Sequence, residues 1–374
     1  MDMIISDFYP FILLPFFFLY GLKIKSKAIF LLPLVAIGYY LGIAIVASFT
    51  EYGSIGNLAS SLRFSKQFLL IPCGALLFTL YGWRGVKSFS SSIIFILCAI
   101  LLSDLIYGSW PRGCGYEGRW GGCLAKFEVY GFPNSSTSYI VLLSLTLILF
   151  HHVKLISTKL LTLALLISAF IALLSISRSA WVFITTGLFF TFLVSINIKR
   201  KVLYLYILSI LIILLFAFDW NLPINTSLFD GVLNKFNYYT AGNEITSGRT
   251  DIWLAAASLI LHSPLFGFGF NYFSIYMPQF DTPHQQYLEL LFKSGIIGFS
   301  IYMYCIYLFC IKFKQLCFNH QVDIKLYKLM LMSVLLPLLI NGLFQPIFSY
   351  SLMGNFFMFA LGFAIEATKS IEEL

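Results

Sequence analysis

The sequence predicts an all-α, polytopic integral membrane protein of about eleven transmembrane helices, because apolar stretches of roughly the 20 residues that a bilayer requires recur along the chain. Hydrophobic residues make up 59% of the chain and charged residues 11%, and the mean hydropathy is +0.88. A soluble domain is about half apolar and a quarter charged. One long polar segment, residues 219–295, separates the eighth stretch from the ninth. Since hydrocarbon offers no partners to backbone N–H and C=O groups, the spans are expected to be helices.

We expect a single membrane domain over residues 1–374, without a fixed repeat or a linker to a soluble module. The first stretch is expected to remain as a helix, because it lacks the basic start and the Ala-x-Ala site of a cleaved secretion signal. The expected spans are Ile4–Leu22, Ala28–Thr50, Gln67–Tyr81, Phe89–Tyr107, Ser136–Phe150, Leu160–Ser175, Ala180–Ile196, Val202–Phe218, Ile296–Phe313, Leu329–Phe348 and Ser351–Ile365.

The 24 Lys and Arg residues are distributed unequally between the two sides of these spans. Because short cytoplasmic loops are enriched in basic residues, the richer side is assigned to the cytoplasm. The N-terminus and residues 219–295 then lie outside, and the C-terminus lies inside. The excess of basic residues behind the net charge of +8 is therefore explained by the membrane topology and does not indicate a nucleic-acid partner. The basic residues assigned to the cytoplasm are Lys23, Lys25, Lys27, Arg84, Lys87, Lys154, Lys159, Lys199, Arg200, Lys201, Lys312, Lys314, Lys325, Lys328 and Lys369.

Two of the seven cysteines, Cys114 and Cys123, share the outer loop 110–131. A periplasm-like compartment permits a disulfide between them. The other cysteines fall in spans or on the inner side and are expected to be free packing residues. No CxxC pair and no Cys/His spacing of a metal site occurs in the sequence, so we expect neither a metal nor another cofactor.

Chemistry or binding is expected in the outer segment, residues 219–295, since nearly every span is free of charge. Residues 219–247 are polar and turn-rich. Residues 250–262 carry apolar residues at helical spacing but are too short to span a bilayer. Residues 263–283 are broken by Pro and Gly and rich in aromatic residues, which suits the membrane–water interface. A helix is expected to resume at residues 285–293.

Arg178 lies at the outer mouth between the sixth and seventh spans. A short outer turn does not need an arginine, and a guanidinium at the interface is costly unless it meets an anion or reaches the lipid headgroups. Two interpretations follow, an anion ligand and a headgroup anchor.

Arg249 stands where the helix over residues 250–262 would begin, with Ser247 or Thr246 as its cap. The free N–H groups of a first helical turn attract anions, and a guanidinium binds phosphate through two parallel hydrogen bonds. The alternative interpretation is an ion pair with Asp251 or Glu244 on a solvated face.

His284 follows Pro283 and opens the helix expected at residues 285–293. A single histidine on a loop is more often a hydrogen-bonding residue than a catalyst. It is nevertheless a titratable base near neutral pH that shares the outer side with Arg178 and Arg249. The only other histidine assigned to that side is His262. We found no nucleophilic Ser/His/Asp set and no nucleotide-binding loop in the sequence.

Four stretches follow one another along the chain and together form a pattern: Gly131–Asn134, Ser177–Trp181, Ser247–Gly269 with Arg249, Trp253 and Pro264, and Pro283–Glu289 followed by Ser294–Gly298. In their order and spacing these stretches resemble the O-antigen ligase/polymerase family of bacterial envelope glycosyltransferases. The likeness in order and spacing covers residues 131–298, and earlier residues match only as a pattern of spans. One departure is Gln285, where the family usually has Asn after the histidine; we expect Gln to preserve the role of the amide.

The resemblance implies a metal-independent, inverting glycosyltransferase of the bacterial inner membrane with its active site facing the periplasm. Its donor would be a glycan linked to undecaprenyl pyrophosphate, and its acceptor a glycan or the lipid A core. Carried over residue by residue, Arg178 and Arg249 bind the pyrophosphate and His284 is the base, with Gln285 and Asn134 in support. A membrane protein that regulates chain length is an implied partner.

The physical chemistry fits these roles. A departing pyrophosphate needs positive charge beside it, which the arginines supply. The attacking hydroxyl must lose a proton, which suits an imidazole with an ordinary pKa of about 6.5.

The compact outer segment favours polymerisation of lipid-linked repeat units. Ligation of the glycan to the lipid A core and transfer to protein hydroxyls are the alternatives with the same donor. The alternative from another class is a transporter or flippase for the lipid-linked sugar. Transporters place ionisable groups near the bilayer midplane, whereas here Asp104 is the main charged residue within a span.

Overall fold

The computed structural model describes residues 24, 26–50, 53, 55–107, 133–174, 177–194, 249–280, 282–319, 324–346 and 351–372. Within these residues the chain is helical, without strands. The expected spans Ile4–Leu22 and Val202–Phe218, residues 219–248, and the pair Cys114 and Cys123 lie outside the described residues. The cysteines that the structure does describe are free, as expected.

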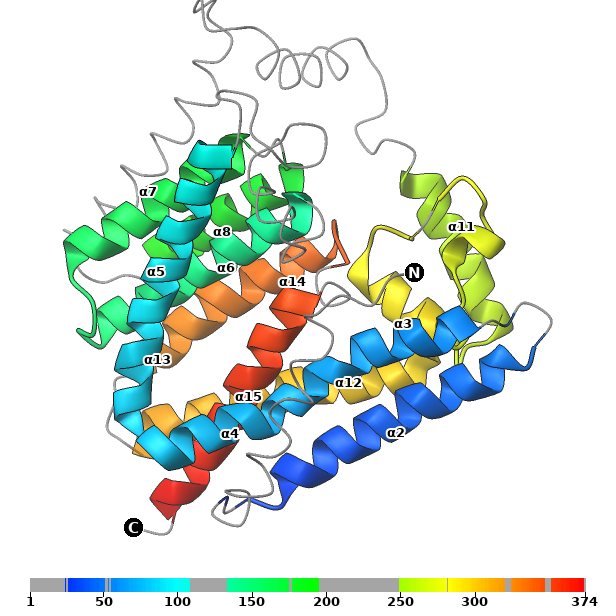
Figure 1. Cartoon of the computed structure of the whole chain (residues 1–374), viewed down its shortest axis with the longest axis horizontal. Helices are drawn as coiled ribbons and strands as arrows, with labels where there is room; N and C mark the ends of the chain where they lie inside the picture. Colours follow the sequence, from blue (N-terminus) through cyan, green and yellow to red (C-terminus); the bar gives the residue numbers. More distant parts are fainter. Residues whose placement is uncertain are drawn as a thin grey trace, which may run out of the picture. The chain divides into compact units, whose positions relative to one another are not determined.

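The chain divides into two compact units. The first comprises residues 1–85, 248–323 and 342–374, and the second comprises residues 86–247 and 324–341. Each is described by itself below. The helices of the first unit are α2 (Ala28–Ser48), α3 (Ile55–Ser65), η3 (Lys66–Leu69), α4 (Leu70–Tyr81), α11 (Arg249–His262), η6 (Phe273–Ile275), α12 (Gln286–Asn319) and α15 (Ser351–Glu372) (Figure 1). The second unit holds most of α5 (Trp83–Tyr107) with α6 (Pro133–His152), α7 (Thr158–Leu174), α8 (Arg178–Val194), α13 (Ile324–Leu329), a π-helical segment (Met330–Leu335) and most of α14 (Leu336–Gly342).

Five of the described helical stretches are long and apolar enough to cross a membrane. Shorter apolar helices cover three further expected spans, and α15 covers the last one. Each expected span that falls within the described residues therefore coincides with a helix, and the prediction of a helical multi-pass membrane protein is confirmed. The count of about eleven stays a prediction. The five long stretches are Ala28–Ser48, Gly56–Tyr81, Trp83–Leu102, Gln286–Phe318 and Ile324–Gly342.

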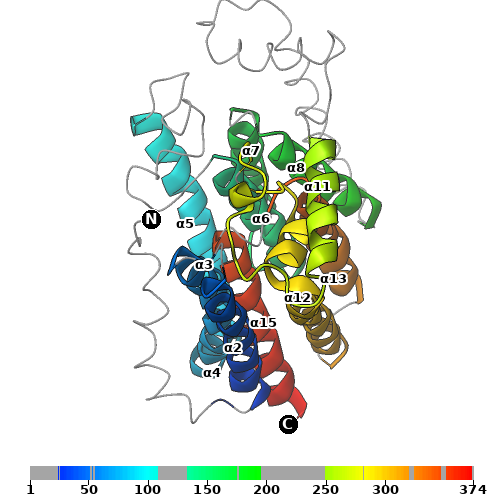
Figure 2. The same ribbon diagram turned by 90° about the vertical axis from the view of Figure 1, so that its right-hand side faces the viewer.

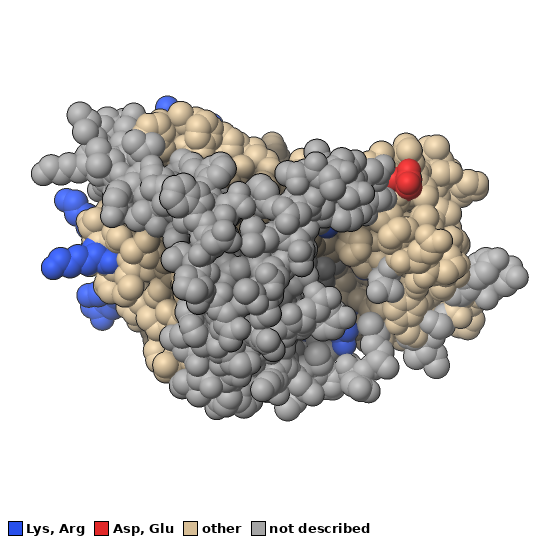
Figure 3. Space-filling view, turned by 90° about the horizontal axis from the view of Figure 1, so that it is seen from above, with Lys and Arg blue, Asp and Glu red and all other residues tan. Residues whose placement is uncertain are grey.

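The outward-facing surface of these helices is apolar, as lipid contact requires. Leu34 on α2 and Phe95 on α5 are 70% and 73% exposed. In the view of Figure 3, most described atoms belong to uncharged residues.

Helix α3 differs from the expectation, because the third span was predicted to begin only at Gln67. Its sequence is too polar to signal a span, yet Asn57 and Ser61 are fully buried. Ser61 Oγ donates to the Tyr40 carbonyl (2.8 Å) and Asn57 Nδ2 donates to Asn271 Oδ1. Burial of polar residues is tolerated where they are hydrogen-bonded, and hydropathy does not detect such partners.

The first unit is built on long helices that run side by side, with α4 against α15 and α12 against both α15 and α2 (Figures 1 and 2). An aromatic cluster joins α2, α3 and α12 to the loop after α11. Tyr40 contacts Phe64 and Phe270 with ring centroids 5.0 and 6.0 Å apart, and Tyr302 lies 5.9 Å from Phe64. The loop that follows α11 is thereby docked onto the membrane helices.

Helix α12 breaks at Gly295, where φ is +62° and ψ is −170°. The break separates the helix expected at residues 285–293 from the span expected at residues 296–313, as the sequence predicted. The loop after α11 supplies donors to the carbonyls that the break leaves open: Phe268 N donates to Phe292 O (2.7 Å), and Phe270 N to Lys293 O (3.3 Å). These bonds cap the carboxyl end of the first part.

The same loop supplies acceptors to the second part of α12. Ile296 N donates to the Pro264 carbonyl at 2.8 Å. The two backbones approach so closely that a Cβ on Gly267 would lie 2.5 Å from Gly295 N, and one on Gly295 would lie 2.2 Å from Leu265 O. Gly267 also has a positive φ of +65°. The glycines of this loop therefore serve backbone packing, consistent with the absence of a nucleotide-binding motif.

In the second unit, α6 packs against α7, α8 and the π-helical segment. Trp181 Nε1 donates to the Ala172 carbonyl (2.6 Å) and ties the start of α8 to the end of α7. The last helix of this unit was expected over Leu329–Phe348 and instead runs from Ile324 to Gly342. Its π-helical segment ends two residues before Pro337, which cannot donate a backbone hydrogen bond and commonly disturbs the preceding turn.

Candidate functional site

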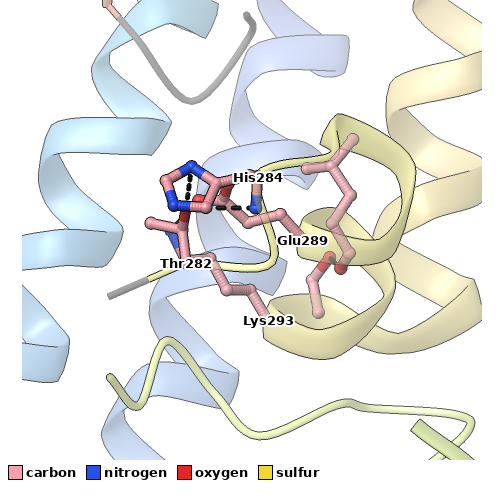
Figure 4. A network of polar contacts seen from close by, with 6 residues as sticks. Thr282, His284, Glu289 and Lys293 are labelled. Carbon is pink, nitrogen blue, oxygen red and sulfur yellow. Dashed lines mark hydrogen bonds and ion pairs between the residues drawn. The ribbon is translucent and has the colours of Figure 1, made fainter. Parts of the chain in front are cut away.

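His284 lies in the short turn between the loop and α12. Its φ is +53°, a left-handed conformation that residues other than glycine rarely adopt. The hydroxyl of Thr282 accepts the backbone N–H of His284 at 3.2 Å, and its Oγ1 lies 3.4 Å from His284 Nδ1. Figure 4 shows the imidazole standing directly over Thr282. The ring is partly buried.

Trp253 connects this turn to α11. Its indole Nε1 donates to the carbonyl of Pro283, the residue before His284, at 3.1 Å. Arg249 lies four residues earlier on the same helix, so its side chain and that of Trp253 share a face and are about one turn apart. Within the first unit, the helix that begins at Arg249 is thus hydrogen-bonded through Trp253 to the turn that carries His284.

Arg249 is the first residue of α11, as the sequence predicted for a residue at a helix start. Its Nη1 donates to the Phe344 carbonyl at 2.9 Å. A guanidinium has five N–H donors in a planar arrangement. The expected caps Ser247 and Thr246, and the alternative partner Glu244, lie outside the described residues.

Gln285 caps helix α12. Its side-chain Oε1 accepts the backbone N–H of Leu288 at 2.6 Å, and its carbonyl accepts the N–H of Glu289 at 3.0 Å. Asn is a preferred residue at this position, because its shorter amide makes the same bond. The departure from the family pattern thus keeps a capping amide at the residue after His284.

Arg178 is the first residue of α8, and Asn134 is the second residue of α6. Ser177 precedes Arg178 and its Oγ accepts the N–H of Ala180 at 3.4 Å, which caps α8. Both predicted residues belong to the second unit, whereas Arg249, His284 and Gln285 belong to the first. Convergence of Arg178 with Arg249 therefore stays a prediction.

Residues 163–303 match the O-antigen ligase family. The predicted family resemblance is confirmed. The matched segment contains Arg178, Arg249, His284 and Gln285 and excludes Asn134. No curated protein matches the chain. The match supports an enzyme of the glycan-transferase type that acts on lipid-linked glycans and resides in a membrane through several helices.

Within the O-antigen ligase segment, the structure draws attention to residues that the sequence did not single out as functional. Glu289 is buried and forms an ion pair with Lys293, one helical turn later (Figure 4). The Lys293 ammonium lies 5.9 Å from the centre of the Phe270 ring, so it also contacts the docked loop. The i,i+4 spacing of Glu and Lys is the sequence signal that could have identified this pair. The sequence also gave no function to Thr282 or Trp253, because a sequence pattern does not show hydrogen bonds to backbone groups.

The described candidate site residues contribute the imidazole of His284, the guanidinium of Arg249 and the start of α12. Among the described residues, no group of three or more His, Cys, Asp or Glu side chains is placed to hold a metal ion. Metal independence and inversion of the sugar stay predictions that follow from the family resemblance.

Proposed function

We propose that the protein is a bacterial cell-envelope glycosyltransferase of the inner membrane. It takes a glycan linked to undecaprenyl pyrophosphate and joins it to a hydroxyl of another lipid-linked repeat unit, which makes it an O-antigen polymerase. The observation that carries the proposal is the hydrogen bond from Trp253 on α11, the helix that Arg249 begins, to the carbonyl of Pro283 beside His284, since it brings a helix start with a guanidinium to the turn that carries an imidazole.

In the proposed reaction, Arg249 and Arg178 bind the two phosphates of the donor on the periplasmic side. The acceptor oxygen forms a bond with the anomeric carbon while the bond from that carbon to the phosphate oxygen breaks. The acceptor proton passes to His284 and then to water. The undecaprenyl pyrophosphate leaves with its charge held by the arginines, and direct displacement inverts the anomeric centre.

Purified full-length protein in detergent, supplied with lipid-linked repeat units, tests the proposal. We expect longer lipid-linked chains with the new linkage inverted relative to the donor. Movement of the lipid-linked glycan across vesicles without any transfer would instead support the transporter.

Ligation to the lipid A core is the second candidate, favoured by the match to the O-antigen ligase family. A deletion strain separates the two on a lipopolysaccharide gel. Loss of the ladder with one retained repeat unit indicates a polymerase, and a bare core indicates a ligase. An unchanged gel with an unglycosylated protein would indicate transfer to protein hydroxyls.

A further inference from the structure

The side chain of Thr282 contacts both the backbone and the imidazole of His284. Its Oγ1 accepts the backbone N–H of His284 at 3.2 Å and lies 3.4 Å from Nδ1 of the imidazole (Figure 4). A threonine hydroxyl has two acceptor lone pairs and one proton to donate. A single oxygen atom can therefore accept both N–H groups of this residue.

The backbone of His284 needs such support. A residue other than glycine at a φ of +53° carries backbone strain, which persists only where neighbouring groups hold it. Thr282 holds the amide of His284, and Trp253 holds the carbonyl of Pro283 just before it. Strain fixed in this way accumulates at functional sites, where a side chain must point in one direction.

The proposed reaction needs one imidazole nitrogen with a lone pair toward the acceptor hydroxyl. A neutral imidazole has one protonated nitrogen and one with a free lone pair, and a hydrogen bond to one nitrogen decides which is which. We propose that Thr282 is a positioning residue that accepts the Nδ1–H of His284, so that Nε2 is the nitrogen that removes the acceptor proton. This inference rests on the proposed function.

The proton balance is complete within these groups. Nδ1 keeps its proton throughout, and Nε2 gains the proton of the acceptor hydroxyl as the glycosidic bond forms. The imidazolium that results carries a positive charge, and its Nδ1–H donates more strongly to Thr282 than the neutral ring does. After transfer, Nε2 releases its proton to water. The hydroxyl of Thr282 therefore acts more strongly on the transition state than on donor binding.

The experiment compares Thr282→Val with Thr282→Ser in the purified full-length protein. Valine keeps the shape and removes the hydroxyl, whereas serine keeps the hydroxyl. We expect Thr282→Val to lower kcat by about tenfold or more, the effect of losing a hydrogen bond to a charged group, with the KM for the lipid-linked donor unchanged. Thr282→Ser, which keeps the hydroxyl, should have a kcat close to that of the wild type. Thr162→Val is the matched control, because the exposed Thr162 hydroxyl donates only to Thr158 O of its own helix.

The outcomes separate this inference from the function on which it rests. A Thr282→Val protein with wild-type kcat, alongside an inactive His284→Ala protein, overturns the positioning role alone. Wild-type transfer by His284→Ala overturns the base itself. If the valine variant fails to fold, Thr282→Cys replaces it, since a thiol is close to serine in size but accepts hydrogen bonds poorly. Equal kcat values for the cysteine and serine variants would then count against Thr282.

Discussion

His284 and His262 are both expected on the outer side of the membrane, but their surroundings differ. His262 is exposed at the end of α11, and its Nδ1 contacts the carbonyl of Ser258 in its own helix (2.9 Å). His284 is partly buried in a strained turn that is held by Trp253 of α11 and by Thr282 of the turn itself. Only His284 has the fixed orientation that a general base requires.

We therefore expect His284→Ala to abolish transfer while the protein still binds the lipid-linked donor, because the base acts on the acceptor. His262→Ala should retain activity close to that of the wild type. Transfer and donor binding are measured separately on the purified proteins. Loss of donor binding in the His284→Ala protein would place this residue with the phosphate ligands instead.

Arg249 offers a second test at the level of one side chain. Lysine keeps the positive charge but has a single ammonium, so Arg249→Lys loses both the two-point contact with phosphate and the planar donor to Phe344 O. We expect a loss of order 2–4 kcal/mol in transition-state stabilisation, by analogy with removal of a preorganised donor. The ratio kcat/KM measures this loss. Arg84→Lys, on the side assigned to the cytoplasm, is the control and should be active.

Sequence reasoning identified candidate site residues whose side chains have a recognisable chemistry, but it did not identify side chains that act by hydrogen-bonding to backbone atoms. It placed Arg249 at a helix start and expected an amide role for Gln285, and the structure has Arg249 opening α11 and Gln285 capping α12. It gave no function to Trp253 or Thr282. Both act on backbone atoms of the turn at His284, and such partners depend on how distant segments meet in space.

At the level of elements, the loop after α11 and the break in α12 explain why glycines recur in this part of the sequence. The loop and the broken helix exchange backbone hydrogen bonds in both directions, and a Cβ on Gly267 or on Gly295 would overlap the backbone of the other segment. Tyr39 on α2 also donates to the carbonyl of Ser294, at 2.7 Å. The turn that carries His284 therefore stands at the start of α12. The break in α12 is held by hydrogen bonds from the loop after α11 and from Tyr39 of α2.

Replacement of either glycine by alanine should destabilise this arrangement. The positive φ alone costs about 1–3 kcal/mol for another residue, and the added Cβ would overlap backbone atoms that cannot move aside. We expect Gly267→Ala and Gly295→Ala to lower the thermal unfolding midpoint in detergent and to reduce transfer. Gly38→Ala on α2 is the control, because nothing lies within 4 Å of its added Cβ and alanine favours a helix. Unchanged unfolding of the Gly267→Ala protein would refute the tight backbone contact.

The elements were predictable to different degrees. Apolar periodicity located the helix over residues 250–262 almost to its ends, because its pattern is local. The same reasoning missed α3, whose polar residues are buried against α2 and the loop. It did separate the helix over residues 285–293 from the span that begins at Ile296, and the non-helical backbone of Gly295 divides α12 at that place.

At the level of the whole molecule, the predicted site residues fall in two different units of the chain. Arg249, His284 and Gln285 belong to the first, and Arg178 and Asn134 belong to the second. Residues 163–303, which match the O-antigen ligase family, contain Arg178, Arg249, His284 and Gln285. Sharing of one pyrophosphate by Arg178 and Arg249 stays a prediction, because it depends on how distant segments of the chain meet and local sequence patterns do not determine that.

A shared periplasmic site sets a strict condition on topology, since the helix starts at Arg178 and Arg249 must both face the outer side. The uneven distribution of Lys and Arg places residues 199–201 in the cytoplasm and residues 219–295 outside. A reporter that is active only in the cytoplasm should therefore be active when fused after Lys201 and silent when fused near Asn234. A reporter that is active only in the periplasm should give the opposite pattern at the same two positions, which controls for expression. Cytoplasmic activity at Asn234 would put His284 on the wrong side of the membrane from a donor presented in the outer leaflet, and both the topology and the proposed reaction would then be wrong.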